Sequence, residues 1–189
     1  MQLAYTLAAG RGDTNLLLLG LARRLMARGL RLAGTVQINT DRADGGPCDM
    51  DVLVLPNGPV LRISQSLGRD SRGCRLDPSA LEAAVGHVAA SLDGAVDLLI
   101  LNKFGKHEAE GRGFRPLIAE AALRGIPVLT GLNGLNRDAF QEFAGGLAVE
   151  VTPRAADLEA WCRAALGLTA SPPQDNGAGG LGQPAPVAG

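Results

Sequence analysis

Short apolar runs alternate with longer stretches of helical periodicity along this chain, and this alternation restricts the fold more than any other feature of the sequence. The runs have the length of strands, and the stretches between them are long enough to cover a sheet. This order predicts a three-layer α/β fold, in which helices lie on both faces of a mostly parallel sheet. The predicted strands are about 3–8, 30–38, 96–101, 126–129 and 147–151, and the predicted helices about 13–28, 77–92, 114–123, 137–143 and 155–166.

Local signals fix several boundaries of these elements. Asp77-Pro78 is a strong helix start, because aspartate caps a helix and proline suits its first position. Asp13 or Thr14 is the expected N-cap of the first helix, and Gly29 is expected to end it. An Asn-Gly turn within residues 52–63 predicts an antiparallel hairpin inserted into the otherwise parallel plan.

Length and charge limit the organisation and the function. A chain of 189 residues suits one domain, predicted at 1–168, and the Pro/Gly/Ala-rich residues 169–189 predict a disordered tail. A net charge of −1 argues against a nucleic-acid or membrane-surface binder, and no apolar run reaches the roughly 18 residues of a membrane span. The start of the chain has no export pattern, which indicates a cytoplasmic protein. Three scattered cysteines suggest reduced structural thiols.

Both lysines of the chain fall in one string, Asn102-Lys103-Phe104-Gly105-Lys106, directly after the apolar run 96–101. The acids Glu108 and Glu110 follow at once. A strand that ends in such a cluster brings cations and carboxylates to the edge where α/β proteins usually bind ligands. The alternative is an exposed loop of salt bridges with little energetic value.

A second candidate site is the turn after the first strand. A strand, a glycine-containing turn and a helix form the phosphate-binding P-loop, in which a lysine holds the β- and γ-phosphates. On the template GxxxxGK[ST], this chain keeps Gly12 and Thr14 but has Asp13 in the place of the lysine. That carboxylate would repel a triphosphate by roughly 1–4 kcal/mol at about 4 Å. The turn with Gly10 and Arg11 could still bind a smaller oxyanion.

The middle of the chain resembles the small P-loop nucleoside triphosphatases of the thermophilic, cancer-related type. In those proteins a strand ends in Asp-Glu-Ile-Gly-Lys-Met-Glu, and here the matching string runs from Asn102 to Glu108. Gly105, Lys106 and Glu108 keep the pattern, whereas Asn102-Lys103 replaces the Asp-Glu pair that organises Mg²⁺ and water. The resemblance implies a P-loop fold in which both halves of the usual hydrolysis apparatus are altered.

Residues 2–165 resemble a bacterial family of unknown function, number 2478, that is associated with molybdate-transport genes. The strings that carry this resemblance are Arg11-Gly12-Asp13, Cys48-Asp49-Met50-Asp51, Ser71-Arg72-Gly73-Cys74 and Gly111-Arg112-Gly113-Phe114. The resemblance implies an accessory protein that binds a nucleotide, ATP or GTP, or an oxyanion such as molybdate, with weak or no hydrolysis. Lys103 could then supply from another strand the cation that the P-loop lacks.

Two alternatives remain open at this point. The chain could be a divergent nucleoside triphosphatase in which Glu108 orients water and Asp51 or Thr14 helps to hold Mg²⁺. It could also be an interaction module with a dead site, and a protein partner or a homo-oligomer is left open. The expected ligand is small and anionic, and its expected binding residues are Gly10, Arg11, Gly12, Asp13, Thr14, Lys103, Lys106 and Arg72.

Overall fold

The computed structural model of the protein describes residues 2–10, 12–43, 45–65 and 75–168. The predicted tail 169–189 and two predicted ligand residues, Arg11 and Arg72, lie outside the described residues. The described residues form a seven-stranded sheet in the order β4-β3-β2-β5-β6-β1-β7. The strands are β1 (Leu3–Thr6), β2 (Leu32–Thr40), β3 (Asp49–Leu55), β4 (Val60–Arg62), β5 (Leu98–Phe104), β6 (Val128–Leu132) and β7 (Val149–Glu150).

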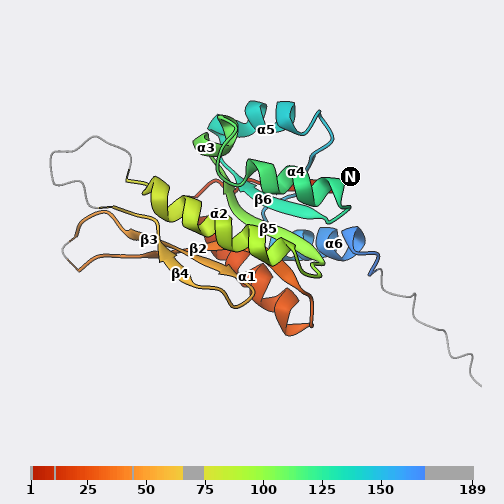
Figure 1. Cartoon of the computed structure of the whole chain (residues 1–189), viewed down its shortest axis with the longest axis horizontal. Helices are drawn as coiled ribbons and strands as arrows, with labels where there is room; N and C mark the ends of the chain where they lie inside the picture. Colours follow the sequence, from red (N-terminus) through yellow and green to blue (C-terminus); the bar gives the residue numbers. More distant parts are fainter. Residues whose placement is uncertain (1, 11, 44, 66–74, 169–189) are drawn as a thin grey trace, which may run out of the picture.

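Helices cover both faces of this sheet, and the three-layer α/β prediction is confirmed. One core joins α1 and α6 to the first face, and a second core joins α2, α4 and α5 to the other face. Figure 1 shows α5 and the β3–β4 hairpin at opposite ends of the molecule. The helices are α1 (Asp13–Ala27), α2 (Pro78–Leu92), α3 (Lys106–Ala109), α4 (Arg115–Leu123), η1 (Gly134–Asn136), α5 (Arg137–Phe143) and α6 (Ala155–Ala165).

The strand directions agree with the predicted plan. β1, β2, β5, β6 and β7 pair in parallel, whereas β3 pairs antiparallel with both β2 and β4. β6 lies between β1 and β5, so the two strands that precede the candidate sites are not direct neighbours. The parallel strands still bring their carboxyl ends to one edge of the sheet, where the turn after β1 and the end of β5 can meet.

Two local predictions require correction. The N-cap of α1 is Gly12 and not Asp13 or Thr14, because the chain turns sharply here and Gly12 takes a left-handed φ of 91° that favours glycine. The strand predicted to end at residue 101 continues through Phe104, so Lys103 lies in β5. Phe104 is fully buried and packs against Phe140 in the second core, which explains why the strand runs on.

Candidate functional site

The turn between β1 and α1, called the cradle below, is described at residues 8–10 and 12–14 and has unpaired backbone N–H groups there. The Thr14 hydroxyl accepts a hydrogen bond from the Ala8 N–H at 3.3 Å and so ties the start of the turn to the helix. The N–H groups of Ala9, Gly10 and Gly12 have no acceptor among the described residues. Free N–H groups at the N-terminus of a 15-residue helix form a site of the kind that binds anions.

Asp13 gives this cradle a negative charge. Its carboxylate folds back over the turn, since one carboxylate oxygen lies 2.0 Å from the position that a Cβ on Gly10 would take. Asp13 itself is exposed. An anion in the turn would therefore meet a carboxylate at the position where a P-loop provides an ammonium group.

Asn102, at the end of β5, links three elements at the same edge of the sheet. Its side-chain amide donates hydrogen bonds to the side-chain oxygens of Asn15 at 3.0 Å and Gln37 at 3.2 Å. Its own side-chain oxygen accepts the backbone N–H of Gln37 at 3.0 Å. Asn102 is only 5% exposed, so every side-chain hydrogen-bonding group that it has is used inside the protein.

Gly131, on β6, lets the end of β5 approach the first turn of α1. A Cβ at this position would lie 2.1 Å from the Asn102 carbonyl oxygen and 2.7 Å from the Thr14 methyl carbon. Only glycine leaves room for both contacts. Gly131 belongs to none of the motifs of the sequence, and the signal that marks it is the absence of a side chain at a buried strand end.

The model of the family described as "Protein of unknown function (DUF2478)" matches residues 3–161. The chain belongs to this family.

One curated protein is similar to this chain in sequence, and one solved structure is similar to it in fold. The molybdenum import ATP-binding protein ModC 2 of Bradyrhizobium diazoefficiens is 35% identical over 162 residues, and this match covers 86% of the chain but only 18% of that protein. A solved structure, a human cancer-related nucleoside triphosphatase, has a TM-score of 0.58 and 16% identity over 89% of the chain and 97% of its own. This likeness shows the P-loop triphosphatase-like fold.

The two lysines of this DUF2478 chain have no hydrogen bond or ion pair to the described residues of the cradle. The Lys103 side chain is exposed and has no ion-pair or hydrogen-bond partner among the described residues. Lys106, in α3, is 84% exposed and lies 3.7 Å from Glu110. Neither lysine forms a hydrogen bond or an ion pair with residues 8–10 or 12–14 in the described part of the chain, whereas Asn102 donates a hydrogen bond to Asn15 on α1. Anion binding by the lysines stays a prediction.

The Glu108 carboxylate is buried and hydrogen-bonded to the backbone. Its two carboxylate oxygens accept the backbone N–H groups of Gly105 at 2.8 Å and Phe114 at 3.1 Å, and the residue is 4% exposed. These bonds hold α3 against the segment that leads into α4. A carboxylate that is bonded in this way would have to exchange both partners before it could orient water.

Asp51 is engaged in a similar way. Its carboxylate pairs with Arg62 across the β3–β4 ladder, and Asp49 lies 2.8 Å from the same guanidinium. No group of three or more His, Cys, Asp or Glu residues that could hold a metal ion occurs in the part of the chain that the structure describes. The metal role of Asp51 also stays a prediction.

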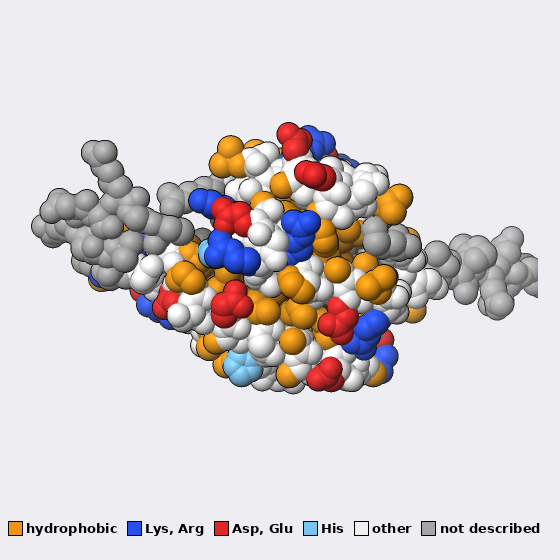
Figure 2. Space-filling model, turned by 45° about the horizontal axis from the view of Figure 1, so that its top comes forward, with side chains coloured by type: hydrophobic (Ala, Val, Ile, Leu, Met, Phe, Trp, Pro, Cys, Tyr) orange, Lys and Arg blue, Asp and Glu red, His pale blue; other side chains and the backbone are white. Residues whose placement is uncertain are grey.

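The face of the molecule drawn in Figure 2 has no large patch of one charge. Figure 2 shows Lys and Arg side chains beside Asp and Glu side chains over this face. Ion pairs account for many of the arginines, including Arg31–Asp97, Arg28–Glu159 and Arg137–Glu150. None of the helices formed by the described residues combines the length and the apolar character needed to cross a membrane.

Proposed function

We propose that this chain is a P-loop-derived accessory domain that binds a nucleotide or a small oxyanion with weak or no hydrolysis. The observation that carries the proposal is the cradle at residues 8–10 and 12–14, in which the N–H groups of Ala9, Gly10 and Gly12 are unpaired among the described residues. Backbone donors at a helix N-terminus favour an anion without a side-chain cation. The functional unit is the domain of residues 1–168.

Weak hydrolysis follows from three side chains. Asp13 replaces the phosphate-binding lysine, Asn102 replaces the acid that organises Mg²⁺, and both oxygens of Glu108 are held by backbone N–H groups. Phosphoryl transfer depends almost entirely on positioning and charge neutralisation. A site without these groups binds without efficient turnover, and Mg²⁺ would matter only if hydrolysis occurs.

Lys103 is the proposed cation of this site, because it has no carboxylate partner among the described residues whereas Lys106 has Glu110. The proposed context is molybdate handling in the cytoplasm. Its support is the 35% identity to a protein whose name is molybdenum import ATP-binding protein. The chain spans 18% of that protein, and the role proposed for it is that of an accessory domain.

Isothermal titration with ATP, GTP and molybdate tests the proposal. We expect at least one of them to bind and Lys103→Ala to weaken that binding by about tenfold, the effect of one lost charge contact. Arg124→Ala, at the end of α4 where Arg124 pairs with Glu120, removes a positive charge outside the candidate site and serves as the control. Binding of none of the three ligands would overturn the proposal. Rapid Mg²⁺-dependent phosphate release would establish a nucleoside triphosphatase instead.

A further inference from the structure

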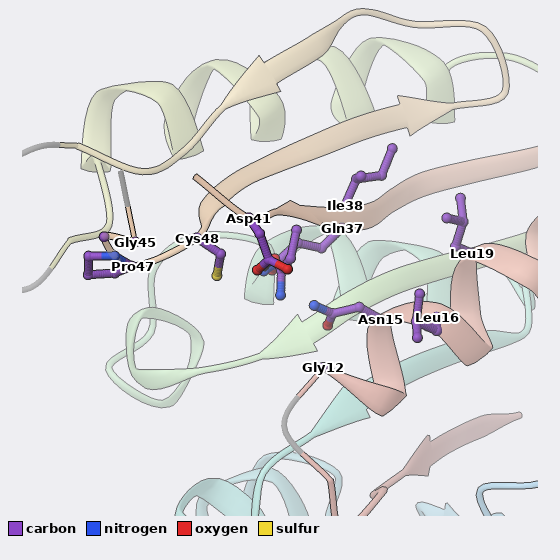
Figure 3. A pocket seen from close by; sticks show the side chains of 12 residues that line it. Gly12, Asn15, Leu16, Leu19, Gln37, Ile38, Asp41, Gly45, Pro47 and Cys48 are labelled. Carbon is purple, nitrogen blue, oxygen red and sulfur yellow. Dashed lines mark hydrogen bonds between the residues drawn. The ribbon is translucent and has the colours of Figure 1, made fainter. Parts of the chain in front are cut away.

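A pocket of about 640 Å³ lies beside the cradle, between the first turns of α1, the end of β2 and residues 45–48. It shares Gly12 with the turn, but its other walls are different. Figure 3 shows the Asn15 side chain on α1 pointing toward Gln37 and Asp41 on the β2 side, with Leu16 and Leu19 farther along α1. Its volume lies in the range of small-molecule sites.

The hydrogen bonds of Asn102 behind this pocket fix which side-chain amide groups act as donors and which act as acceptors. Asn102 donates both of its amide hydrogens, one to the side-chain oxygen of Asn15 and one to that of Gln37. Since these two oxygens point toward Asn102, the NH₂ groups of Asn15 and Gln37 are turned away from it. The Gln37 NH₂ donates one hydrogen to the Asn39 side-chain oxygen at 2.7 Å. The pocket therefore receives amide N–H donors, fixed from behind by a buried residue.

The described residues that line the pocket carry a negative charge, which would repel an anion. None of its described lining residues is lysine or arginine, and Asp41 contributes a carboxylate. The Asp41 side chain has no hydrogen-bond or ion-pair partner among the described residues. Leu16, Leu19 and Ile38 add apolar surface. A ligand that fits these walls is neutral, accepts hydrogen bonds from the side-chain amides of Asn15 and Gln37, and donates hydrogen bonds to the Asp41 carboxylate.

We propose that this pocket binds a neutral heterocyclic base through an edge that has a carbonyl oxygen beside N–H and NH₂ groups. Guanine and pterin-type rings share this edge. The carbonyl oxygen would accept from Asn15 and Gln37, and the two adjacent N–H donors would be accepted by Asp41. Adenine has an NH₂ group in place of the carbonyl and an acceptor in place of the ring N–H, so it mismatches both partners.

Pro47 and Cys48, which line the pocket, are held in place by a residue that does not line it. The Arg75 guanidinium donates to the carbonyl oxygens of Cys48 at 3.1 Å and Pro47 at 3.3 Å. Cys48 is half-buried and lines the pocket, so its thiol can report occupancy. Cys162 does not interfere, since it is fully buried and burial raises the pKa of its thiol to about 12. A Cys74→Ser background removes the third thiol.

The test is calorimetric titration of the full chain with guanosine, adenosine and pterin, together with the rate of Cys48 alkylation. We expect guanosine or pterin to bind at least about tenfold more tightly than adenosine and to slow alkylation. Guanosine has no phosphate, so its binding does not depend on the cradle. The guanosine and pterin arms show which ring the pocket prefers.

Asp41→Asn provides the specificity readout, because an amide can donate to a ring oxygen where a carboxylate cannot. Xanthosine has an oxygen in the position of the guanine NH₂ group. We expect the variant to lose guanosine affinity by about tenfold and to gain xanthosine affinity by a similar factor. Asp93→Asn, on the exposed end of α2, makes the same substitution elsewhere and should change neither. Equal binding of guanosine and adenosine, no binding of guanosine or pterin, or loss of both nucleosides without a gain for xanthosine would overturn the proposal.

Discussion

The side-chain amide of Asn102 donates a 3.0 Å hydrogen bond to the side-chain oxygen of Asn15, and this bond joins the end of β5 to the first turn of α1. The two residues are 87 positions apart in the chain. The neutral side-chain amide of Asn102 thus holds α1, β2 and the end of β5 together at this edge of the sheet.

Asn102→Asp should destabilise the protein and should not restore hydrolysis. The carboxylate would place an oxygen against the side-chain oxygens of Asn15 and Gln37 and would lose both donated bonds. At a site that is 5% exposed, we expect the free energy of unfolding to fall by about 2–4 kcal/mol. Chemical denaturation measures this loss. Asn57→Asp, at an exposed turn, adds the same charge and should have little effect, and equal stability of both variants would contradict the role of the amide.

Gly131→Ala should disturb the same junction by steric contact alone. Its new Cβ would lie 2.1 Å from the Asn102 carbonyl oxygen and 2.7 Å from the Thr14 methyl carbon, and both distances are far inside van der Waals contact. We expect a loss of about 2 kcal/mol or more in the free energy of unfolding, together with weaker ligand binding at the turn. Gly134→Ala is the control, because nothing lies within 4 Å of its Cβ. A thermal melt that fails to separate the two variants would refute the predicted crowding.

Elements with local signals could be predicted from the sequence. α2 runs from Pro78 to Leu92 as expected, because the Asp77 side chain accepts the N–H groups of Ser79 and Ala80 and stops the chain from extending the helix backward. The hairpin and its pairing also followed from the pattern of strand, turn and strand. In each case, residues a few positions apart decide the structure.

The junction at Asn102 could not be predicted in this way. A polar pair after an apolar run suggests a strand end, yet β5 continues because Asn102 finds partners on α1 and β2 and Phe104 enters the core. The partners Asn15 and Gln37 carry no spacing signal relative to Asn102. The strand order that brings them together depends on tertiary packing, which one sequence does not encode in a readable local pattern.

Glu108 variants should separate a structural role from a catalytic one. Glu108→Gln keeps one oxygen acceptor but places an NH₂ group against a backbone N–H, and we expect it to cost about 1–2 kcal/mol; Glu108→Ala should cost about 2–3 kcal/mol. Glu110→Gln, two residues along the chain and exposed, should leave the denaturation midpoint near that of the wild type. If Glu108→Gln is fully stable but abolishes phosphate release, Glu108 is catalytic and the structural assignment is wrong.

Asp13→Ala should strengthen nucleotide binding. The substitution removes the carboxylate that folds over Gly10 at the mouth of the cradle, and it leaves the backbone donors in place. At a solvent-exposed site the relief of repulsion is at the low end of its range, so we expect affinity for ATP to rise by about fivefold, or ~1 kcal/mol. Glu82→Gln on the exposed side of α2 changes the net charge equally and should have no effect in the same titration. Unchanged or weaker ATP binding by Asp13→Ala would show that Asp13 does not oppose the ligand.

Asp97 should make a contribution to stability that depends on pH. Its carboxylate accepts hydrogen bonds from the Arg31 backbone N–H at 2.8 Å and from a guanidinium N–H at 3.1 Å. These bonds hold the pKa of Asp97 below its ordinary value of 3.8, and the bond from the guanidinium has the largest effect. Because the pKa is lower in the folded protein, the stabilisation is fully present above pH 3.8 and is lost as the pH falls through the lowered value.

Asp97→Asn should therefore lower the free energy of unfolding by about 1 kcal/mol at pH 7, a value that allows for solvent around the pair. The difference from the wild type should stay constant down to about pH 4 and shrink below it, since the protonated wild-type carboxyl then resembles the amide. Urea denaturation between pH 2 and pH 7 measures the difference, and Asp93→Asn supplies the exposed comparison. A gap between wild type and Asp97→Asn that persists at the lowest pH would mean that packing, and not the charge of Asp97, stabilises the start of β2 against β5.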